Sequence, residues 1–182
     1  MSIQKEETVT SEEIFAGRVI RVLRDEVLLE NGLHATREVV RHNGGAAVIA
    51  IDENDAITMI RQYRYASGCA LCEIPAGKLE KGENPFAAAK RELEEEAGII
   101  AAEYYDMGYI IPTCGYCDEK IYLYAAKGLT HTAQHLDADE FVSVYTLPLA
   151  EAVQQVLKNE ITDGKTVAAI LKLKLLRDAK QF

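Results

Sequence analysis

Acidic side chains crowd one short stretch of the sequence, which contains Glu92, Glu94, Glu95 and Glu96. Glu92 and Glu96 are four residues apart, so they share one face of a helix. Like charges at that spacing cost about 0.2–0.5 kcal/mol per pair, and carboxylates near a helix C-terminus also oppose the helix dipole. A bound divalent cation would relieve this repulsion, since Mg²⁺ binds carboxylate, water and phosphate oxygens. The alternative interpretation is a solvated acidic face.

The sequence around these glutamates predicts a helix over residues 85–97. Asn84 is a suitable N-cap, proline suits the first helical position, and Gly98 suits the C-terminal stop. A sheet must position this helix. Residues 46–51 are all apolar, which predicts a central buried strand, and residues 56–63 predict the strand that returns beside it.

The remaining pattern indicates a mixed sheet flanked by helices. Asn31-Gly32 marks a tight turn of the kind that closes hairpins. The first 43 residues are rich in predicted strand and suggest a closely attached subdomain. Further strands are expected near residues 19–23, 27–29, 36–41, 104–111, 120–126 and 141–145, and further helices over 149–157 and after Asp163.

Composition excludes several classes of protein. The 182 residues carry a formal net charge of −9, which is unsuited to general binding of a nucleic-acid backbone. The apolar content of 48% argues against a disordered chain. The sequence contains no run of 18 apolar residues, so it predicts no membrane span. The polar, acidic N-terminal residues do not resemble a signal peptide. We therefore expect a cytoplasmic protein.

The four cysteines form two CxxC pairs, Cys69 with Cys72 and Cys114 with Cys117. Paired CxxC motifs can build a tetrahedral structural zinc site, although this gap is longer than in common zinc ribbons. The favoured interpretation is four small buried residues in and beside two loops, because a free cysteine behaves as a small hydrophobe.

Residues 77–99 carry a motif that extends beyond the helix. Gly77, Glu83 and the run Arg91-Glu92-Leu93-x-Glu95-Glu96-x-Gly98-Ile99 resemble the Nudix box at every fixed position. Softer similarities to ADP-ribose pyrophosphatases lie at residues 17–20, 36–42, 61–65, 73–80 and 136–141. The resemblance implies an α/β fold, namely an α/β/α sandwich with a mixed sheet over residues 44–182, and an antiparallel N-terminal β subdomain over residues 1–43.

The resemblance also implies a metal-dependent site. Glu92, Glu96 and the Ala76 carbonyl are expected to bind the metal, and Glu95 to bind a further metal or orient a water molecule. Glu83 and Arg91 are expected to hold the loop and helix together. We select Glu140 as the general base, with Asp137, Asp139 and Glu95 as the alternatives.

Substrate contacts are expected from both parts of the chain. Arg37 and Arg64 could grip phosphate or ribose, because a guanidinium group suits phosphate oxygens. Glu38 and Glu73 could accept hydrogen bonds from adenine or ribose, and Glu119 could contact the ribose side. The alternative for each arginine is a strand-end salt bridge. In the loop that leads to Glu119, Cys114 stands where relatives usually have proline.

The function implied is Mg²⁺-dependent hydrolysis of ADP-ribose to AMP and ribose 5-phosphate, with Mn²⁺ as a substitute ion. The alternatives are the same chemistry on another nucleotide sugar or dinucleotide, and a non-catalytic ADP-ribose sensor. The resemblance also implies a homodimer formed through the N-terminal β-region. No nucleic-acid or membrane partner is expected.

Overall fold

The computed structural model describes residues 5–138 and 140–182 of the chain. The chain divides into two compact units. The first comprises Met1–Gly44 and Ile111–Lys120, and the second comprises Gly45–Ile110 and Ile121–Phe182. Within the described ranges, no helix is long and apolar enough to cross a lipid bilayer.

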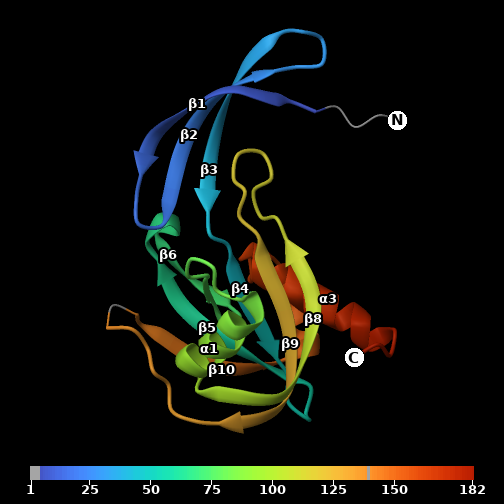
Figure 1. Ribbon diagram of the computed structural model, residues 1–182. Coiled ribbons are helices and arrows are strands. Elements are labelled where there is room, and N and C mark those ends of the chain that lie inside the picture. Colours follow the sequence, from blue (N-terminus) through green and yellow to red (C-terminus); the bar gives the residue numbers. More distant parts are fainter. Residues whose placement is uncertain (1–4, 139) are drawn as a thin grey trace. The chain divides into compact units, whose positions relative to one another are not determined.

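The first unit is built on an antiparallel sheet in the order β1-β2-β3, drawn in blue in Figure 1. Its strands are β1 (Glu7–Ala16), β2 (Ile20–Leu28) and β3 (His34–His42). The predicted turn lies between β2 and β3. There Gly32 has a φ of +79°, and the Leu33 N–H donates to Asn31 Oδ1 at 3.0 Å. The predicted antiparallel N-terminal sheet is therefore confirmed.

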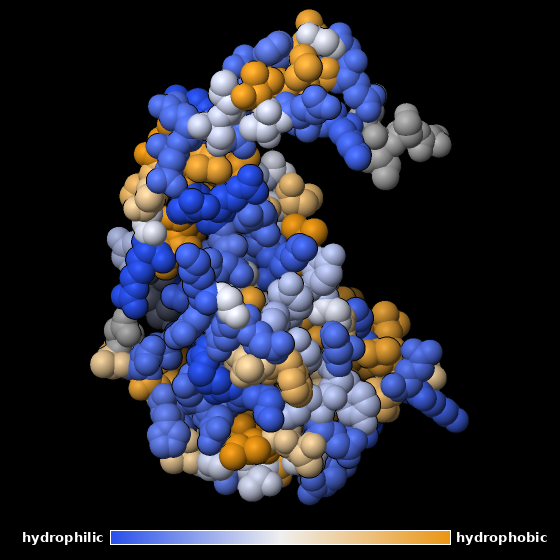
Figure 2. All heavy atoms as spheres, in the orientation of Figure 1, coloured by the Kyte–Doolittle hydropathy of each residue, from blue (hydrophilic) through white to orange (hydrophobic). Residues whose placement is uncertain are grey.

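This sheet buries few of its side chains. Every residue of β1 is exposed, including Val9, Ile14 and Phe15, and hydrophobic atoms interrupt the polar surface of these strands in Figure 2. Because most of β1 is polar and shows no regular alternation, the sequence does not predict it as a strand.

Strand β4 (Gly45–Ala50) is the centre of the second unit, and all its residues are buried, as its apolar sequence predicts. It lies in a four-stranded sheet in the order β7-β4-β9-β8. β4 runs parallel to β9, whereas the other two pairings are antiparallel, so the sheet is mixed as expected. Its other strands are β7 (Ala76–Lys78), β8 (Ile99–Ile110) and β9 (Ile121–His131).

A second sheet in this unit is antiparallel, in the order β10-β5-β6. Its strands are β5 (Ala56–Arg64), β6 (Cys69–Glu73) and β10 (Val142–Pro148). A short 3₁₀ helix, η1 (Tyr65–Ser67), joins β5 to β6. The α-helices are α1 (Pro85–Ala97), α2 (Leu149–Leu157) and α3 (Gly164–Asp178).

The two faces of β4 belong to two hydrophobic clusters. Ala46, Val48 and Ala50 pack with residues of α1, whereas Ala47 and Ile49 pack with residues of β5, α2 and α3. Side chains alternate between the faces of a strand, so one short strand contributes to both clusters. This arrangement fixes α1 against the mixed sheet, and it confirms the predicted α/β fold.

Candidate active site

Helix α1 carries the acidic cluster, and its ends are fixed by the residues predicted to cap it. Asn84 Oδ1 accepts hydrogen bonds from the N–H groups of Phe86 at 2.9 Å and Ala87 at 3.2 Å. Gly98 adopts the left-handed conformation, with φ of 62°, and its N–H donates to the Glu94 carbonyl at 2.9 Å. Both helix ends are thus set by local sequence.

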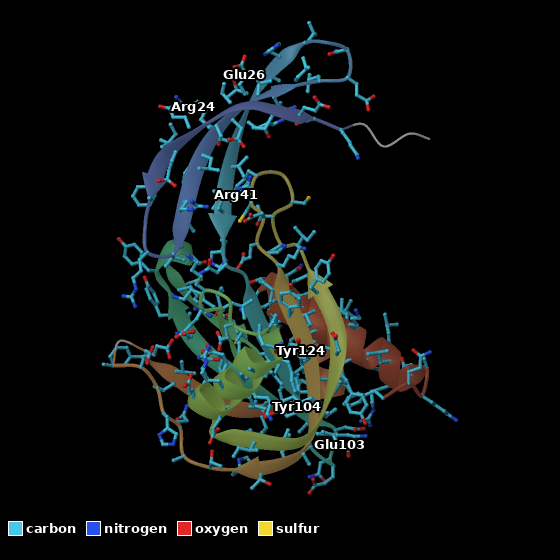
Figure 3. All side chains as sticks on the ribbon, viewed as in Figure 1. Arg24, Glu26, Arg41, Glu103, Tyr104 and Tyr124 are labelled. Atoms are coloured by element: carbon cyan, nitrogen blue, oxygen red, sulfur yellow. The ribbon has the colours of Figure 1, made fainter. Side chains whose placement is uncertain are left out.

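Packing against the sheet fixes the rotation of α1. Ala88, Ala89 and Leu93 are fully buried in the cluster shared with β4. Phe86 adds ring contacts to Tyr104 and Tyr124, which lie close together on β8 and β9 in Figure 3. Because the apolar side of the helix faces the sheet, its inner glutamates are held at the border of the core.

Glu92 and Glu96 are both buried. Glu96 Oε2 accepts a hydrogen bond from the Ala76 N–H at 2.7 Å, which ties the helix to β7. Glu92 lies against the backbone of Gly77, where a Cβ atom would come within 1.8 Å of Glu92 Oε1. A glycine at this position therefore leaves the space that the carboxylate fills.

Arg91 links the neighbouring acids. One guanidinium nitrogen, Nη1, donates to Glu92 at 2.7 Å and to Glu95 at 2.8 Å, and the Nε donates to Glu83 at 3.2 Å. Glu83 also accepts from the N–H of Glu80 at 2.9 Å. The expected link between loop and helix through Glu83 and Arg91 is present.

One arginine does not neutralise these acids. Burial raises the pKa of Glu96 to about 8, and the charges of Glu92 and Glu140 add to the rise, whereas the Ala76 N–H opposes it. Burial also raises the pKa of Glu92, although Arg91 opposes this shift. Both carboxyl groups would be stabilised as anions by a cation.

The donor set suits a hard cation that also binds phosphate. Within residues 5–138 and 140–182, no three Asp, Glu, His or Cys side chains form a preassembled metal cluster. Mg²⁺ needs no such cage, since it is usually held by one or two carboxylates, water and substrate phosphate oxygens. Burial raises the pKa values of Glu92 and Glu96, and the nearby arginines offset this rise only in part, so these two buried oxygen donors fit such an ion.

Glu140 is half-buried, and its N–H donates to the Asp137 carbonyl at 3.0 Å. Its charge raises the pKa of both Glu92 and Glu96, which places it within electrostatic range of the helix carboxylates. Asp137 is exposed, and Asp139 lies outside the described residues.

Arg64 and Glu73 form a bidentate ion pair on neighbouring strands. Arg64 Nε donates to Glu73 Oε1 at 2.6 Å, and Nη2 donates to Oε2 at 2.7 Å. The Glu73 side chain is 1% exposed, whereas that of Arg64 is 38% exposed. Arg64 is therefore held by a buried acid and keeps part of its guanidinium at the surface. Its charge also lowers the pKa of Glu96 against the larger effect of burial.

Three expected substrate residues lie in the first unit. Arg37 is half-buried on β3 and makes a bidentate contact with Glu6, at 2.9 and 2.6 Å. Glu38 is exposed on the same strand, and Glu119 Oε1 lies 3.4 Å from His42 Nδ1. The other expected site residues, Arg64, Glu73, Ala76, Glu92, Glu95, Glu96 and Glu140, lie in the second unit.

Comparison with known proteins decides the family. A NUDIX domain model matches residues 41–170, and a model of the nucleoside diphosphate sugar hydrolase N-terminal domain matches residues 6–40. The chain belongs to the NUDIX family. The resemblance inferred from residues 77–99 is confirmed, and the chain is a Nudix hydrolase that resembles ADP-ribose pyrophosphatases.

Several relatives of this Nudix hydrolase span nearly its whole length. A methanol dehydrogenase activator of Bacillus methanolicus is 46% identical over 94% of each chain. An ADP-ribose pyrophosphatase of Bacillus subtilis is 39% identical over 96% of each chain. One from Mycobacterium tuberculosis is 38% identical and covers 91% of this chain and 81% of its own. The crystal structure of an ADP compounds hydrolase matches the fold with a TM-score of 0.84, covering all of both chains at 22% identity.

The cysteines of this Nudix hydrolase differ from the expectation of small buried residues. Cys69 and Cys114 are exposed, and Cys72 and Cys117 are half-buried. Cys69 opens β6 directly after the turn at Gly68, and Cys114 lies in the turn after β8, so neither side chain reaches a core. Among the described residues, no group of side chains forms the alternative zinc site.

Sequence reasoning missed Lys165. Its Nζ donates to Glu73 and, at 3.0 Å, to Asp163, and its side chain is 10% exposed. Together with Arg64 it lowers the pKa of Glu73, although burial alone would raise it. The contact of Lys165 with Asp163, the N-cap of α3, could be expected because the two residues are close in sequence. Nothing in the sequence indicates the contact of Lys165 with a glutamate on β6.

Proposed function

We propose that this Nudix hydrolase cleaves the diphosphate of ADP-ribose to give AMP and ribose 5-phosphate, with Mg²⁺ as its metal. The observation that carries the proposal is the pair of buried helix carboxylates, Glu92 and Glu96, whose pKa values are raised by burial. ADP-ribose pyrophosphatases at 39% and 38% identity support the choice of substrate.

Glu92, Glu96 and the Ala76 carbonyl would hold the ion, with Glu95 as a further ligand or a water-orienting group. When bound, Mg²⁺ supplies charge neutralisation, phosphate orientation and a more acidic water. Mn²⁺, which favours the same oxygen ligands, is the expected substitute. Gly77 keeps the space for the Glu92 carboxylate, and Arg91 donates hydrogen bonds to both Glu92 and Glu95.

Glu140 is our choice of general base, because its charge already acts on Glu92 and Glu96. A base must lie within reach of the attacking water, which sits beside the phosphates. Replacing Glu140 and Glu95 separately by glutamine would separate the two candidates. The base variant should lose kcat and the pH dependence of kcat, whereas a variant that only weakens metal binding should recover at high Mg²⁺.

Arg64 is proposed to contact phosphate or ribose through the exposed part of its guanidinium group, which Glu73 orients. Glu73 is proposed to act through Arg64, since its own oxygens are already occupied by Arg64 and Lys165. Arg37, Glu38 and Glu119 stay proposals for substrate contact.

The deciding experiment measures AMP release from ADP-ribose with Mg²⁺. Glu96→Gln should lose activity by about 100-fold or more, by analogy with other groups that position a reacting phosphate. Glu94→Gln is the matched control, because it removes the same charge from the same helix at a residue that has no proposed role. No turnover by the unmodified chain would overturn the substrate. Equal loss in both variants would overturn the assignment of Glu96.

A second candidate function is activation of a dehydrogenase, which the 46% identical methanol dehydrogenase activator supports. It is tested by adding the chain to a methanol dehydrogenase and following the rate of methanol oxidation. Glu96→Gln would show whether any stimulation needs the hydrolytic site. GDP-mannose pyrophosphatases at 28% and 29% identity support inclusion of GDP-mannose in the substrate panel.

We further propose a homodimer and a cytoplasmic location. The exposed apolar residues of β1, Val9, Ile14 and Phe15, support an interface on the first unit. Light scattering coupled to gel filtration would measure the mass, and Phe15→Glu should lower it if β1 lies in the interface. A monomeric mass for the unmodified chain would overturn the dimer.

A further inference from the structure

The two CxxC pairs have the same spacing but lie in different secondary structure. Cys69 and Cys72 lie on β6, where they pair in register with Arg64 and Arg61. Residues three apart on a strand point to opposite faces and are separated by about 10 Å. A disulfide needs Cα atoms within about 7 Å and converging side chains, so this pair cannot close while β6 is intact.

Cys114 and Cys117 lie instead within one tight turn. The Thr113 carbonyl accepts the N–H of Tyr116 at 3.4 Å and that of Cys117 at 3.1 Å. These bonds have the spacing of a helical turn, in which side chains three residues apart have Cβ atoms about 5–6 Å apart. A disulfide needs about 3.5–4.5 Å between Cβ atoms, so a small local movement closes the gap.

The half of the turn that contains Cys114 has the space to make that movement. A Cβ atom built on Gly115 would meet nothing within 4 Å, and Cys114 is exposed. Cys117 is anchored by its neighbours, because Val40 donates its N–H to the Tyr116 carbonyl at 2.7 Å and accepts the Asp118 N–H at 3.1 Å. One cysteine is therefore free to approach and the other is held in place.

Asp118 strengthens this anchor at the end of β3. Its side chain accepts hydrogen bonds from the His42 N–H at 2.9 Å and from Arg41 at 3.2 Å. Figure 3 shows Arg41 on β3 beside the loop between β8 and β9 that carries this turn. The half of the turn that includes Cys117 is thus part of the first unit's hydrogen-bonded structure.

We propose that Cys114 and Cys117 form a thiol–disulfide site that reacts with small-molecule disulfides, whereas Cys69 and Cys72 do not pair. The Cys114 thiolate attacks one sulfur of the small disulfide, forms a mixed disulfide and releases one thiol. The Cys117 thiolate then attacks Cys114 Sγ and releases the second thiol. The two cysteines lose two electrons and two protons, and the small disulfide gains both.

The test treats the folded, full-length chain with oxidised glutathione and maps its cysteines by mass spectrometry after alkylation. Free thiols should fall from four to two, with the loss of two hydrogen masses in the peptide that contains Cys114 and Cys117. A dithiol reductant should restore all four. Glutathione adducts at Cys114 and Cys117 without the internal bond would overturn the proposal, and so would a bond between chains.

Two matched controls isolate the turn. The double variant Cys69→Ser/Cys72→Ser should oxidise like the unmodified chain, whereas Cys114→Ser should leave Cys117 as a thiol or a glutathione adduct. In denaturant the two CxxC segments have the same loop length, so their internal disulfide bonds should form equally well. A preference for the Cys114–Cys117 bond that persists in the unfolded chain would show that local sequence, and not the folded turn, selects it.

Discussion

The Glu92 carboxylate packs directly against the backbone of Gly77, in the space that a side chain at residue 77 would fill. A Cβ atom on residue 77 would lie 1.8 Å from Glu92 Oε1. No rotamer adjustment of an alanine can avoid this, because the Cβ position is set by the backbone. The smallest side chain would thus displace a proposed metal ligand.

Gly77→Ala should therefore lower kcat/KM by about 100-fold, because displacing a group at the reacting centre by about 1 Å has that effect. Gly164→Ala is the matched control, since a Cβ there meets nothing within 4 Å and its φ is not positive. Steady-state AMP release checks both variants. Full activity of Gly77→Ala would contradict the role of Glu92.

Arg91→Gln tests the charge balance around Glu92. Arg91 opposes the rise that burial causes in the pKa of Glu92, so its loss should raise that pKa further. Glu92 must be ionised to bind metal, hence the acid limb of kcat/KM should move to higher pH. Arg21→Gln, which alters an exposed ion pair with Glu13, should leave the profile in place. If the acid limb of the kcat/KM profile does not move in Arg91→Gln, ionisation of Glu92 does not control activity.

The pH dependence of stability tests Glu96 without substrate. Burial raises the pKa of Glu96 from 4.5 to about 8 in the folded chain. Between these values the folded state holds a proton that the unfolded state has lost, so the free energy of unfolding should fall as pH rises from about 4.5 to about 8. Urea denaturation of the metal-free chain measures this slope. Glu96→Gln should flatten it, and Mg²⁺ should stabilise the chain more at pH 8 than at pH 5.

Lys165→Met tests the buried ion pairs of Glu73. The substitution leaves a carboxylate that is 1% exposed with Arg64 as its remaining charged partner among the contacts described, and should cost about 1–3 kcal/mol of unfolding free energy. Lys174→Met is the control, because it breaks an exposed i,i+4 pair with Asp178 worth about 0.3–0.5 kcal/mol. Equal losses in the two variants would show that Lys165 does not stabilise Glu73.

Local sequence predicted the elements whose ends carry strong caps. Asn84, Gly98 and Asp163 bound helices where they were expected to. Strand β8 begins at Ile99, earlier than its predicted start near residue 104, because pairing with β9 extends it past the apolar run. Strands β6 and β7 are short and owe their structure to pairing with β5 and β4, so no local periodicity indicated them.

The site was predictable where it lies in one segment. Glu92, Glu95 and Glu96 follow from the spacing on α1, and the link from Arg91 to Glu83 follows from the same motif. The contact of Lys165 with Glu73 joins residues far apart in sequence, and the anchoring of the Cys114 turn on Val40 does so too. Such contacts depend on the tertiary fold, which single-segment patterns do not encode.

The parallel pairing of β4 with β9 has a consequence for how the chain is made. β4 ends at Ala50 and its partner begins at Ile121, so α1 and its glutamates leave the ribosome before that edge of β4 can be covered. A nascent chain that stops before β9 would carry an apolar strand with one open edge, which is prone to aggregate. Synthesis that pauses before β9 has left the ribosome should therefore reduce the yield of folded protein more than a pause after β9 has emerged.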